Sequence, residues 1–273
     1  MSLFLRFVGW INQNLQQQPL KDESKRSENV DSNSVSEKDT NKREFYYDKA
    51  EAKKQGKLWR AAEKNKPWYD APAKVKVTTK KGLCHMHIEL TVGLPPEGVY
   101  DLLANPNDFP FFRIDNETGR ELLENKSRKV LMKDGPRQIA QLEKAVTWDF
   151  LWWCGAFPFT LIVDENQKDF RAKYKKKKMM FMKVFEGSWK IEPLYVDSER
   201  LCKDREPKSR EEYKRCSGGQ GKVASKVTMD QYFQPYFLLN IPPLSWYIRA
   251  ITIKTTKKLL KLIQNASIMF RDA

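Results

Sequence analysis

The sequence of 273 residues lacks the motifs by which most enzymes are identified. It contains no GxSxG elbow, no HExxH, no Walker loop and no GxGxxG, and "GGQGK" from Gly218 lacks the spacing of a phosphate cradle. Only two histidines are present, so a histidine-based triad has little basis. Acid–base work by a lone carboxylate stays open. These absences favour a domain that binds over one that catalyses, and they predict no catalytic residue and no cofactor.

Paired cysteines and long apolar runs are also missing. The four cysteines form no CxxC pair and show no regular spacing, and the first residues lack a basic start, an apolar run and a cleavage site. We therefore expect an intracellular protein with reduced thiols, cytoplasmic in the first place, with the nucleus or an organelle as alternatives, and not secreted. No stretch approaches the roughly 18 to 20 apolar residues of a membrane-spanning helix.

Composition divides the chain into four parts. Residues 1–18 have the pattern of a short amphipathic helix that lies on a membrane surface or docks on the domain. Residues 19–44 are polar, without aromatics before residue 45, and predict a disordered linker. Residues 45–72 form a basic, aromatic lead-in. Residues 73–273 are expected to form one domain of about 200 residues, with a charged insertion loop at 197–217.

Two basic segments account for the whole net charge of +15. Residues 42–81 carry 13 Lys/Arg against 5 Asp/Glu, and residues 171–183 carry 7 Lys/Arg and no acidic residue. Such fields suggest anionic partners, although a solvated face is an alternative. In residues 42–81, rings interleaved with lysines are typical of a platform for single-stranded nucleic acid, and packing of the rings on the chain's own domain is the preferred interpretation. These rings are Tyr46, Tyr47, Trp59, Trp68 and Tyr69.

The segment "KVKVTTKKGLCHMHIELTV" predicts a strand or hairpin in which apolar and polar residues alternate. Cys84, Met86, Ile88 and Leu90 should face the core. His85, His87 and Glu89 share the other face, in a set similar to two histidines and a carboxylate around a metal. Consecutive positions on an outer strand face rarely converge on one ion, so no metal site is predicted.

The rest of the chain predicts helices at both ends of a meander of strands. "GLPPEGVYDLLANPNDFPFF" predicts a helix from Pro95 to Asn105 and a second short one at 108–112. Between residues 120 and 233, strand-like runs are joined by turns such as "DGP", "NQKD" and "SGG". The closing segment from Pro242 to Phe270 has apolar residues at threes and fours, which predicts a long amphipathic helix that covers a sheet.

This order is that of the helix-grip fold, and two segments support it. "GLPPEGVYDLLANPNDFPFFR" and "FEGSWKIEPL" resemble, respectively, the helical segment and a later strand of the START-like, polyketide-cyclase and coenzyme-Q-binding superfamily (SRPBCC, birch-pollen-allergen-like). With "LWRAAEKNKPWYDAPAKVKV" included, the chain is similar to a plant family of START-like proteins of unknown function. The resemblance implies an α+β fold, with a curved antiparallel sheet wrapped around the final helix and two short helices after the first strand.

The resemblance also implies an apolar cavity, which in relatives holds lipids, sterols, polyketides or prenylated quinones. The candidate cavity residues are Phe111, Phe112, Trp148, Phe150, Trp152, Phe159, Trp189, Tyr247 and Ile251. A basic rim of Lys173, Lys175, Lys176, Lys177 and Lys178 suits docking on an anionic membrane, with a nuclear-localisation signal as the rival explanation.

Three functional hypotheses follow. The first is non-enzymatic binding, and possible transfer, of a lipid, sterol or isoprenoid. The second is a nucleic-acid or protein interaction module that uses residues 42–81. The third is a cyclase-type enzyme.

One segment, "WDFLWWCGAFPF" at 148–159, holds six aromatic residues. Its glycine and proline predict a strand that bends or changes register near Gly155. Its length and Asp149 exclude a membrane span, so its rings are expected to line the cavity or to fill it.

Overall fold

The computed structural model describes residues 47–65, 67–104, 123–150, 153–203 and 206–272, and for 148–150, 153–154 and 272 it describes the backbone alone. The helices are α2 (Lys49–Asn65), α3 (Pro96–Ala104), α4 (Ser198–Leu201), α5 (Arg210–Cys216), the 3₁₀ turn η3 (Phe237–Leu239) and α6 (Leu244–Asp272). The strands are β1 (Lys74–Lys80), β2 (Leu83–Val92), β3 (Leu123–Asp134), β4 (Arg137–Phe150), β5 (Trp153–Asn166), β6 (Arg171–Met179), β7 (Met182–Tyr195) and β8 (Val223–Pro235).

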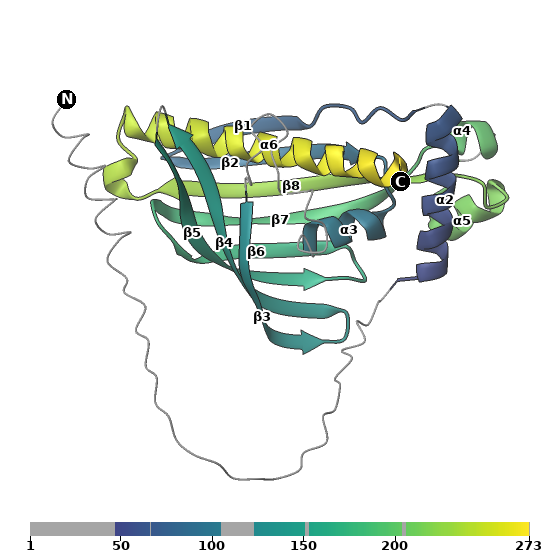
Figure 1. The fold of residues 1–273 in the computed structure, drawn as a ribbon, viewed down its shortest axis with the longest axis horizontal. Coiled ribbons are helices and arrows are strands. Elements are labelled where there is room, and N and C mark those ends of the chain that lie inside the picture. Colours follow the sequence, from purple (N-terminus) through teal and green to yellow (C-terminus); the bar gives the residue numbers. More distant parts are fainter. Residues whose placement is uncertain (1–46, 66, 105–122, 151–152, 204–205, 273) are drawn as a thin grey trace, which may run out of the picture. The chain divides into compact units, whose positions relative to one another are not determined.

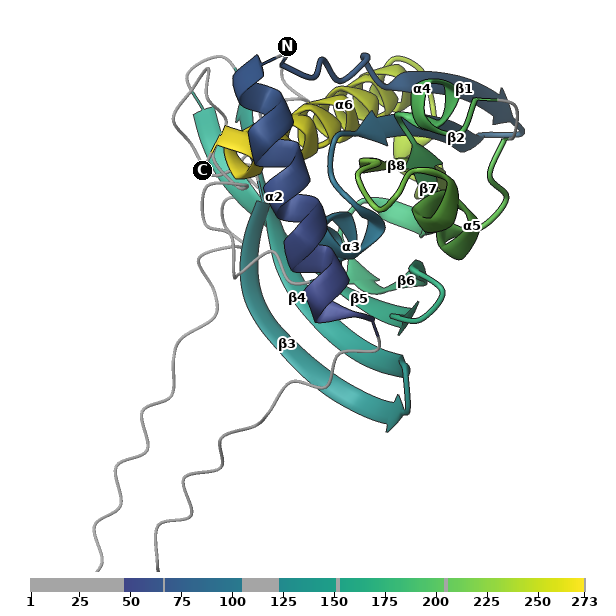
Figure 2. The ribbon, with the colours of Figure 1, turned by 90° about the vertical axis from the view of Figure 1, so that its right-hand side faces the viewer.

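The eight strands form one antiparallel sheet in the order β1-β2-β8-β7-β6-β5-β4-β3. Consecutive strands pair from β3 to β8, and β2 closes the order by pairing with β8. The sheet curves so that α3 lies in its hollow and α6 runs across it (Figures 1 and 2). The predicted α+β helix-grip fold is confirmed.

Strand β2 has the predicted alternation. Cys84, Met86, Ile88 and Leu90 are fully buried, and the residues between them are half-exposed. Apolar side chains on one face of a strand are removed from water together, which fixes the strand's register. The core face of the sheet is therefore its concave face, on which α3 and α6 pack.

The predicted helices at 95–105 and 242–270 are present as α3 and α6. In α3, Val99 and Leu102 are buried against the sheet. The second short helix, predicted at 108–112, lies outside the described residues. In α6 only the second half is packed tightly, through Leu260, Leu262, Ile263 and Ala266.

Helix α2 was not predicted, because it is mostly polar and contains few large apolar residues. It packs near the end of α6 through Trp59, whose indole nitrogen donates to the Val223 carbonyl over 2.9 Å. The Trp59 ring meets Trp68 edge to face at 5.6 Å between ring centres. These two rings thus pack on the chain's own domain, in agreement with the preferred interpretation of the sequence. Tyr69, in contrast, is exposed.

The insertion at 197–217 contains two short helices and a disulfide between Cys202 and Cys216. The expectation of reduced thiols is therefore wrong for this pair. The two cysteines lie 14 residues apart, with Cys216 as the last residue of α5. The fold of the insertion brings their Cα atoms to 5.0 Å, a proximity that sequence spacing does not reveal. Cys84 is a free, buried thiol, and burial raises its pKa.

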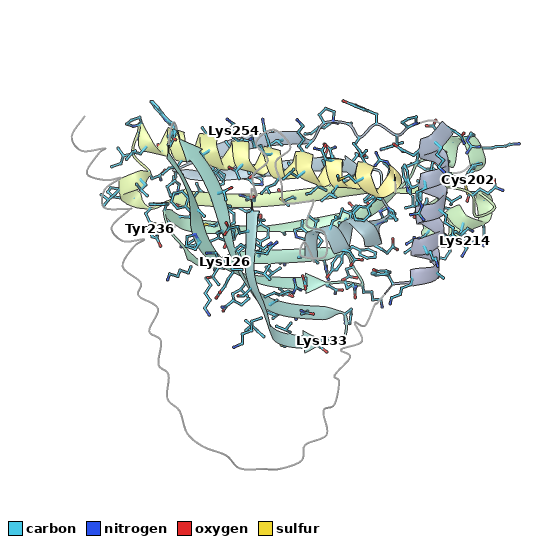
Figure 3. All side chains as sticks on the ribbon, in the orientation of Figure 1. Lys126, Lys133, Cys202, Lys214, Tyr236 and Lys254 are labelled. Atoms are coloured by element: carbon cyan, nitrogen blue, oxygen red, sulfur yellow. A yellow bond between two sulfur atoms is a disulfide. The ribbon has the colours of Figure 1, made fainter. Side chains whose placement is uncertain are left out.

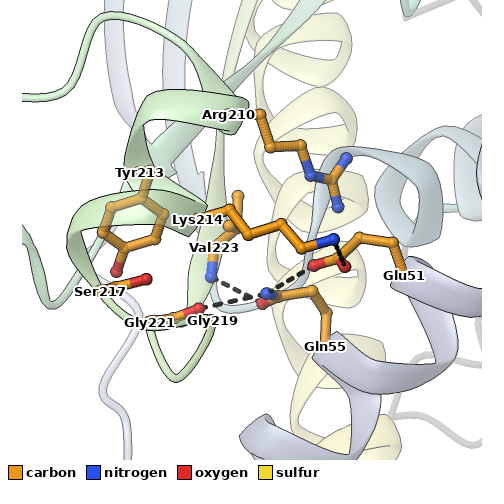
Figure 4. Close-up of a pocket in the computed structure, with 9 residues that line it drawn as sticks. All are labelled: Glu51, Gln55, Arg210, Tyr213, Lys214, Ser217, Gly219, Gly221 and Val223. Atoms are coloured by element: carbon orange, nitrogen blue, oxygen red, sulfur yellow. Dashed lines mark hydrogen bonds and ion pairs between the residues drawn. The ribbon is translucent and has the colours of Figure 1, made fainter.

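A small pocket lies between α2 and the insertion (Figure 4). Its volume of about 10 Å³ is room for roughly one water molecule. Gln55 crosses it, donating to the Gly221 carbonyl over 3.1 Å and accepting from the Val223 amide over 2.9 Å. Lys214 pairs with Glu51 at its edge. The contacts around this pocket hold α2 against the insertion and β8, and the pocket itself is too small for an organic ligand.

The aromatic segment 148–159 is a hairpin and not one bent strand. Strands β4 and β5 pair from Phe150 and Trp153 outward, with Trp148 opposite Gly155. The prediction of a bend at Gly155 is wrong because β4 ends at Phe150 and its antiparallel partner β5 begins at Trp153, before the glycine. The two residues between them, Leu151 and Trp152, include none of the usual turn residues. Gly155 and Pro158 lie within β5 instead.

Candidate ligand-binding site

The concave face carries a continuous apolar wall. On β5, Phe159, Leu161 and Val163 alternate with outward residues and are buried. On β7, Trp189 and Ile191 continue the wall, and Trp189 meets the Tyr100 ring of α3 at 5.7 Å. Side chains at every second position share one face of a strand, so these rows face α3 and α6.

An open groove of about 430 Å³ lies along the middle of α6. Its lining, as far as the described residues form it, consists of Ala250, Ile253, Lys254, Lys257, Lys258 and Lys261. The surface that these residues present is apolar because the lysines contribute their aliphatic stems. In the first half of α6, residues 246–258 are half-buried or exposed, in contrast to the second half.

An ion pair lies inside the curve of the sheet. Arg128 of β3 pairs with Glu165 of β5 and donates through Nη1 to the Ala104 carbonyl over 2.7 Å, at the end of α3. Burial raises the pKa of Glu165, while the Arg128 guanidinium opposes that rise. Burial and the charge of Glu165 also raise the pKa of Tyr100, so this phenol stays protonated.

Two further polar side chains face each other beside this pair. Asn125 of β3 lies opposite Lys144 of β4 in the sheet register. On its other side, Lys144 lies opposite Phe159 of β5. Burial and the nearby Arg128 charge lower the pKa of Lys144 to about 8, with Glu165 opposing this in part. Lys144 was not predicted as a site residue. The sequence did contain a signal for this residue: a lysine at position 144 alternates with the apolar residues Leu142 and Val146 on one face of a strand.

The predicted cavity residues fall into three groups. Phe159 and Trp189 lie on the concave wall, where both are buried. Tyr247 and Ile251 lie in the first half of α6, with 42% and 39% of their surfaces exposed, and burial raises the pKa of Tyr247. The others lie outside the described residues, or have only their backbone described: Phe111, Phe112, Trp148, Phe150 and Trp152.

The predicted lysine rim lies on β6. Lys173, Lys175, Lys177 and Lys178 are exposed. Lys175 lies 3.9 Å from a Glu186 carboxylate oxygen, and Lys177 donates to Gln141 Oε1. Lys176 is half-buried: its ammonium donates to the Met182 carbonyl and the Tyr236 hydroxyl.

A group of exposed apolar side chains, here called the apolar tip, follows β8. It comprises Phe237, Leu238, Ile241 and Trp246, whose exposed fractions are 79%, 76%, 49% and 64%. The Tyr236 amide donates to the Phe181 carbonyl over 3.0 Å, so the tip adjoins the turn between β6 and β7. Tyr236 and Cys202 mark opposite ends of the described fold (Figure 3). The apolar tip is therefore remote from the insertion.

His85 and His87 both contact Asp230 on the outer face. Nε2 of His85 and Nδ1 of His87 lie 2.8 and 3.0 Å from the same oxygen, Oδ1 of Asp230. Burial opposes ionisation of Asp230, but the histidine contacts outweigh it and hold the Asp230 pKa below its ordinary value. Glu89 pairs with Lys226 instead. Among the described residues, no three His, Cys, Asp or Glu side chains gather as metal ligands.

A family model described as a domain of unknown function, DUF220, matches residues 74–273. The chain belongs to the DUF220 family. No curated protein matches the chain. In the part of this DUF220 chain that the structure describes, no helix is both long and apolar enough to cross a bilayer.

The DUF220 chain is similar to solved structures of three kinds. The Zhui aromatase/cyclase of a Streptomyces species is 11% identical, with a TM-score of 0.42, covering 68% of this chain and 93% of that one. A ginseng major latex-like protein (Panax ginseng) is 8% identical, with a TM-score of 0.37 and coverages of 68% and 97%. The lipid transfer and protein localization domain of human StarD13 is 12% identical, with a TM-score of 0.40 and coverages of 77% and 94%. These are the kinds of protein that the sequence resemblance named, and at such scores they assign no activity to this chain.

Proposed function

We propose that the chain binds an apolar ligand, such as a lipid, sterol or isoprenoid, between the concave face of the sheet and α6, without a catalytic step. The apolar wall on the concave face, together with an open groove of about 430 Å³ along the middle of α6, carries this proposal. Its volume is within the range of small-molecule sites, and its surface, like theirs, is mostly apolar. Each methylene that the ligand removes from water contributes about 0.8 kcal/mol.

Native mass spectrometry and lipid extraction of protein from its own tissue test this proposal directly. An apolar molecule that co-purifies is expected. Tight, salt-sensitive RNA binding with no such molecule would favour the second hypothesis, in which residues 42–81 bind nucleic acid.

A variant that fills the groove gives a quantitative test. Ala250→Trp places a large ring in the groove, where it competes with a ligand for space. We expect it to weaken binding of the neutral dye Nile red by about tenfold or more, because a loss of about 1.4 kcal/mol in binding free energy corresponds to tenfold in affinity. The measurement is a fluorescence titration. Met269→Trp is the control, because Met269 is exposed on the second half of α6, outside the groove lining. Equal weakening by both variants would argue against the groove as the binding site.

We propose further that the apolar tip docks on an anionic membrane. Lys176 lies 5.1 Å from the centre of the Tyr236 ring, so the lysine-rich end of β6 lies beside the tip. Apolar side chains can enter the interface while the neighbouring lysines meet anionic headgroups, each at about 1 kcal/mol. Docking there would bring a membrane to the end of α6 that lies nearer the groove.

The double change Phe237→Glu with Leu238→Glu is expected to lower the apparent affinity for phosphatidylserine-containing vesicles by at least about tenfold. It removes two exposed apolar side chains from the tip and adds two negative charges that the anionic membrane repels. Vesicle sedimentation measures this affinity. Tyr69→Glu, which changes an exposed ring between α2 and β1, is the matched control. Added salt should weaken the binding of the unchanged protein. Undiminished binding by the double variant would remove the tip from the docking surface.

A further inference from the structure

The facing pair Asn125 and Lys144 lies on the concave face of the sheet. Lys144 alternates on β4 with Leu142 and Val146, and both of these pack against the core. Asn125 alternates on β3 with Leu123, which also packs against the core. Because every second residue of a strand shares a face, both polar side chains project inward.

The two side chains offer hydrogen-bond donors without acceptors. The Asn125 Nδ2 atom is shielded from solvent and donates no hydrogen bond. Lys144 is half-buried, and among the described residues nothing forms an ion pair or hydrogen bond with its ammonium group. Buried polar groups are nearly always paired, and a buried charge without a partner is costly. These two donors are therefore open to an acceptor that comes from outside the chain.

The neighbouring charges do not supply that acceptor. A β-bulge between Asn125 and Ser127 puts Arg128 on the same face as Asn125. Glu165, the carboxylate whose charge acts on Lys144, is already paired with Arg128. Tyr100 is protonated and adds no charge. Arg128 and Lys144 together carry two positive charges, and the Glu165 carboxylate carries one negative charge. This leaves an excess of one positive charge on the concave face.

We propose that Asn125 and Lys144 bind the carboxylate of an amphiphilic ligand whose apolar chain lies along the concave wall. This inference rests on the proposed function, for which it specifies a ligand class. A carboxylate has one negative charge to offset the excess, and two oxygens that accept from the ammonium and the amide. A lone hydroxyl would leave the charge of Lys144 unbalanced.

The test compares palmitate with hexadecanol, which share a chain and differ in the end group. Isothermal titration of the unchanged protein is expected to show palmitate binding at least about tenfold more tightly, since hydrogen bonds to charged groups are the stronger ones. Lys144→Met should abolish this preference while hexadecanol still binds, and Asn125→Leu should reduce it. Lys129→Met, an exposed lysine on the outer face of β3, should leave it unchanged.

The outcomes separate the two proposals. If neither probe binds, the proposed function fails and this inference fails with it. If both probes bind equally, or if Lys144→Met keeps the preference for palmitate, the carboxylate site is wrong while apolar binding stands. The preference should also decline as the pH rises above about 8, where Lys144 loses its proton in the free protein.

Stability without ligand provides a second readout that a merely structural lysine would not give. The folded-state pKa of Lys144 is about 8, against an ordinary value of 10.5 in the unfolded chain. Between these values the unfolded chain binds a proton that the folded chain does not, so stability rises with pH across this window. Lys144→Met should remove that rise and raise the melting temperature near pH 7. A lower melting temperature for Lys144→Met would show that the ammonium is already satisfied within the chain.

Discussion

Replacing Arg271 by methionine is expected to lower the free energy of unfolding by about 3 to 5 kcal/mol, because breaking a buried ion pair leaves charges without partners. The Arg271 side chain is fully buried near the end of α6. Its Nε lies 3.1 Å from Glu63 and its Nη1 lies 3.2 Å from Asp70. Its Nη2 donates to the Trp68 carbonyl over 3.2 Å. We call this arrangement the clasp, since it fastens α2 and the following segment to α6.

Methionine fills similar space but leaves the two buried carboxylates of Glu63 and Asp70 without the guanidinium that pairs with them. Asp70 would keep its bonds from the Gly93 amide and the Trp68 indole, yet it would lose its only strong counter-charge among the described residues. Urea unfolding followed by circular dichroism measures the loss. Arg137→Met breaks the exposed pair with Asp164 and serves as the control, with an expected loss within about 1 kcal/mol. Equal losses for both variants would mean that the clasp does not hold the fold together.

Gly187→Ala is expected to destabilise the protein by about 1 to 3 kcal/mol, the usual effect of overpacking a core. A Cβ atom at this position of β7 would collide with the Asp230 carbonyl oxygen of β8, and it would lie 2.5 Å from the Tyr174 hydroxyl oxygen. The carbonyl belongs to the backbone of the neighbouring strand and cannot rotate away. Tyr174 covers the glycine from β6 and donates to Gln231 over 3.3 Å, so the ring would have to leave its position.

The melting temperature measures this second effect. Gly56→Ala is the control, because its Cβ would meet only the Arg60 guanidinium, at 3.9 Å, in the middle of α2. In a helix interior, alanine is favoured over glycine by roughly 0.5 to 1 kcal/mol, so a small gain is expected there. A Gly187→Ala variant as stable as the unchanged protein would show that β7 and β8 separate readily at this point.

Much of the fold was predictable because it depends on local periodicity. The alternation from Cys84 to Leu90 and the spacing of apolar residues in 95–105 and 242–270 predicted β2, α3 and α6, since burying one face requires these patterns. Helix α2 was missed because only Gln55 and Trp59 of it are buried. The hairpin in 148–159 was missed because its turn lacks the usual turn residues and the nearby Gly155 and Pro158 mark the wrong place.

The site was less predictable, because its pairs are distant in the sequence. The sequence does not indicate that Asn125 lies opposite Lys144, because a β-bulge shifts the register between β3 and β4 and no sequence pattern marks it. The ion pair of Arg128 with Glu165 likewise depends on how three strands align. The aromatic side chains of Phe159 and Trp189 were identified from composition and the resemblance, and the polar groups beside them were not.

The clasp has a consequence for the order in which the chain folds. Glu63 and Arg271 are 208 residues apart in the sequence, whereas β3 to β7 pair with their immediate successors. Contacts between distant segments form late, because closing a long loop costs more entropy than closing a hairpin. We expect the hairpins to form first, and the pairing of β2 with β8 and the closure of the clasp to come last. Until then the apolar wall is open to water, so the partly folded chain is most prone to aggregate at this stage.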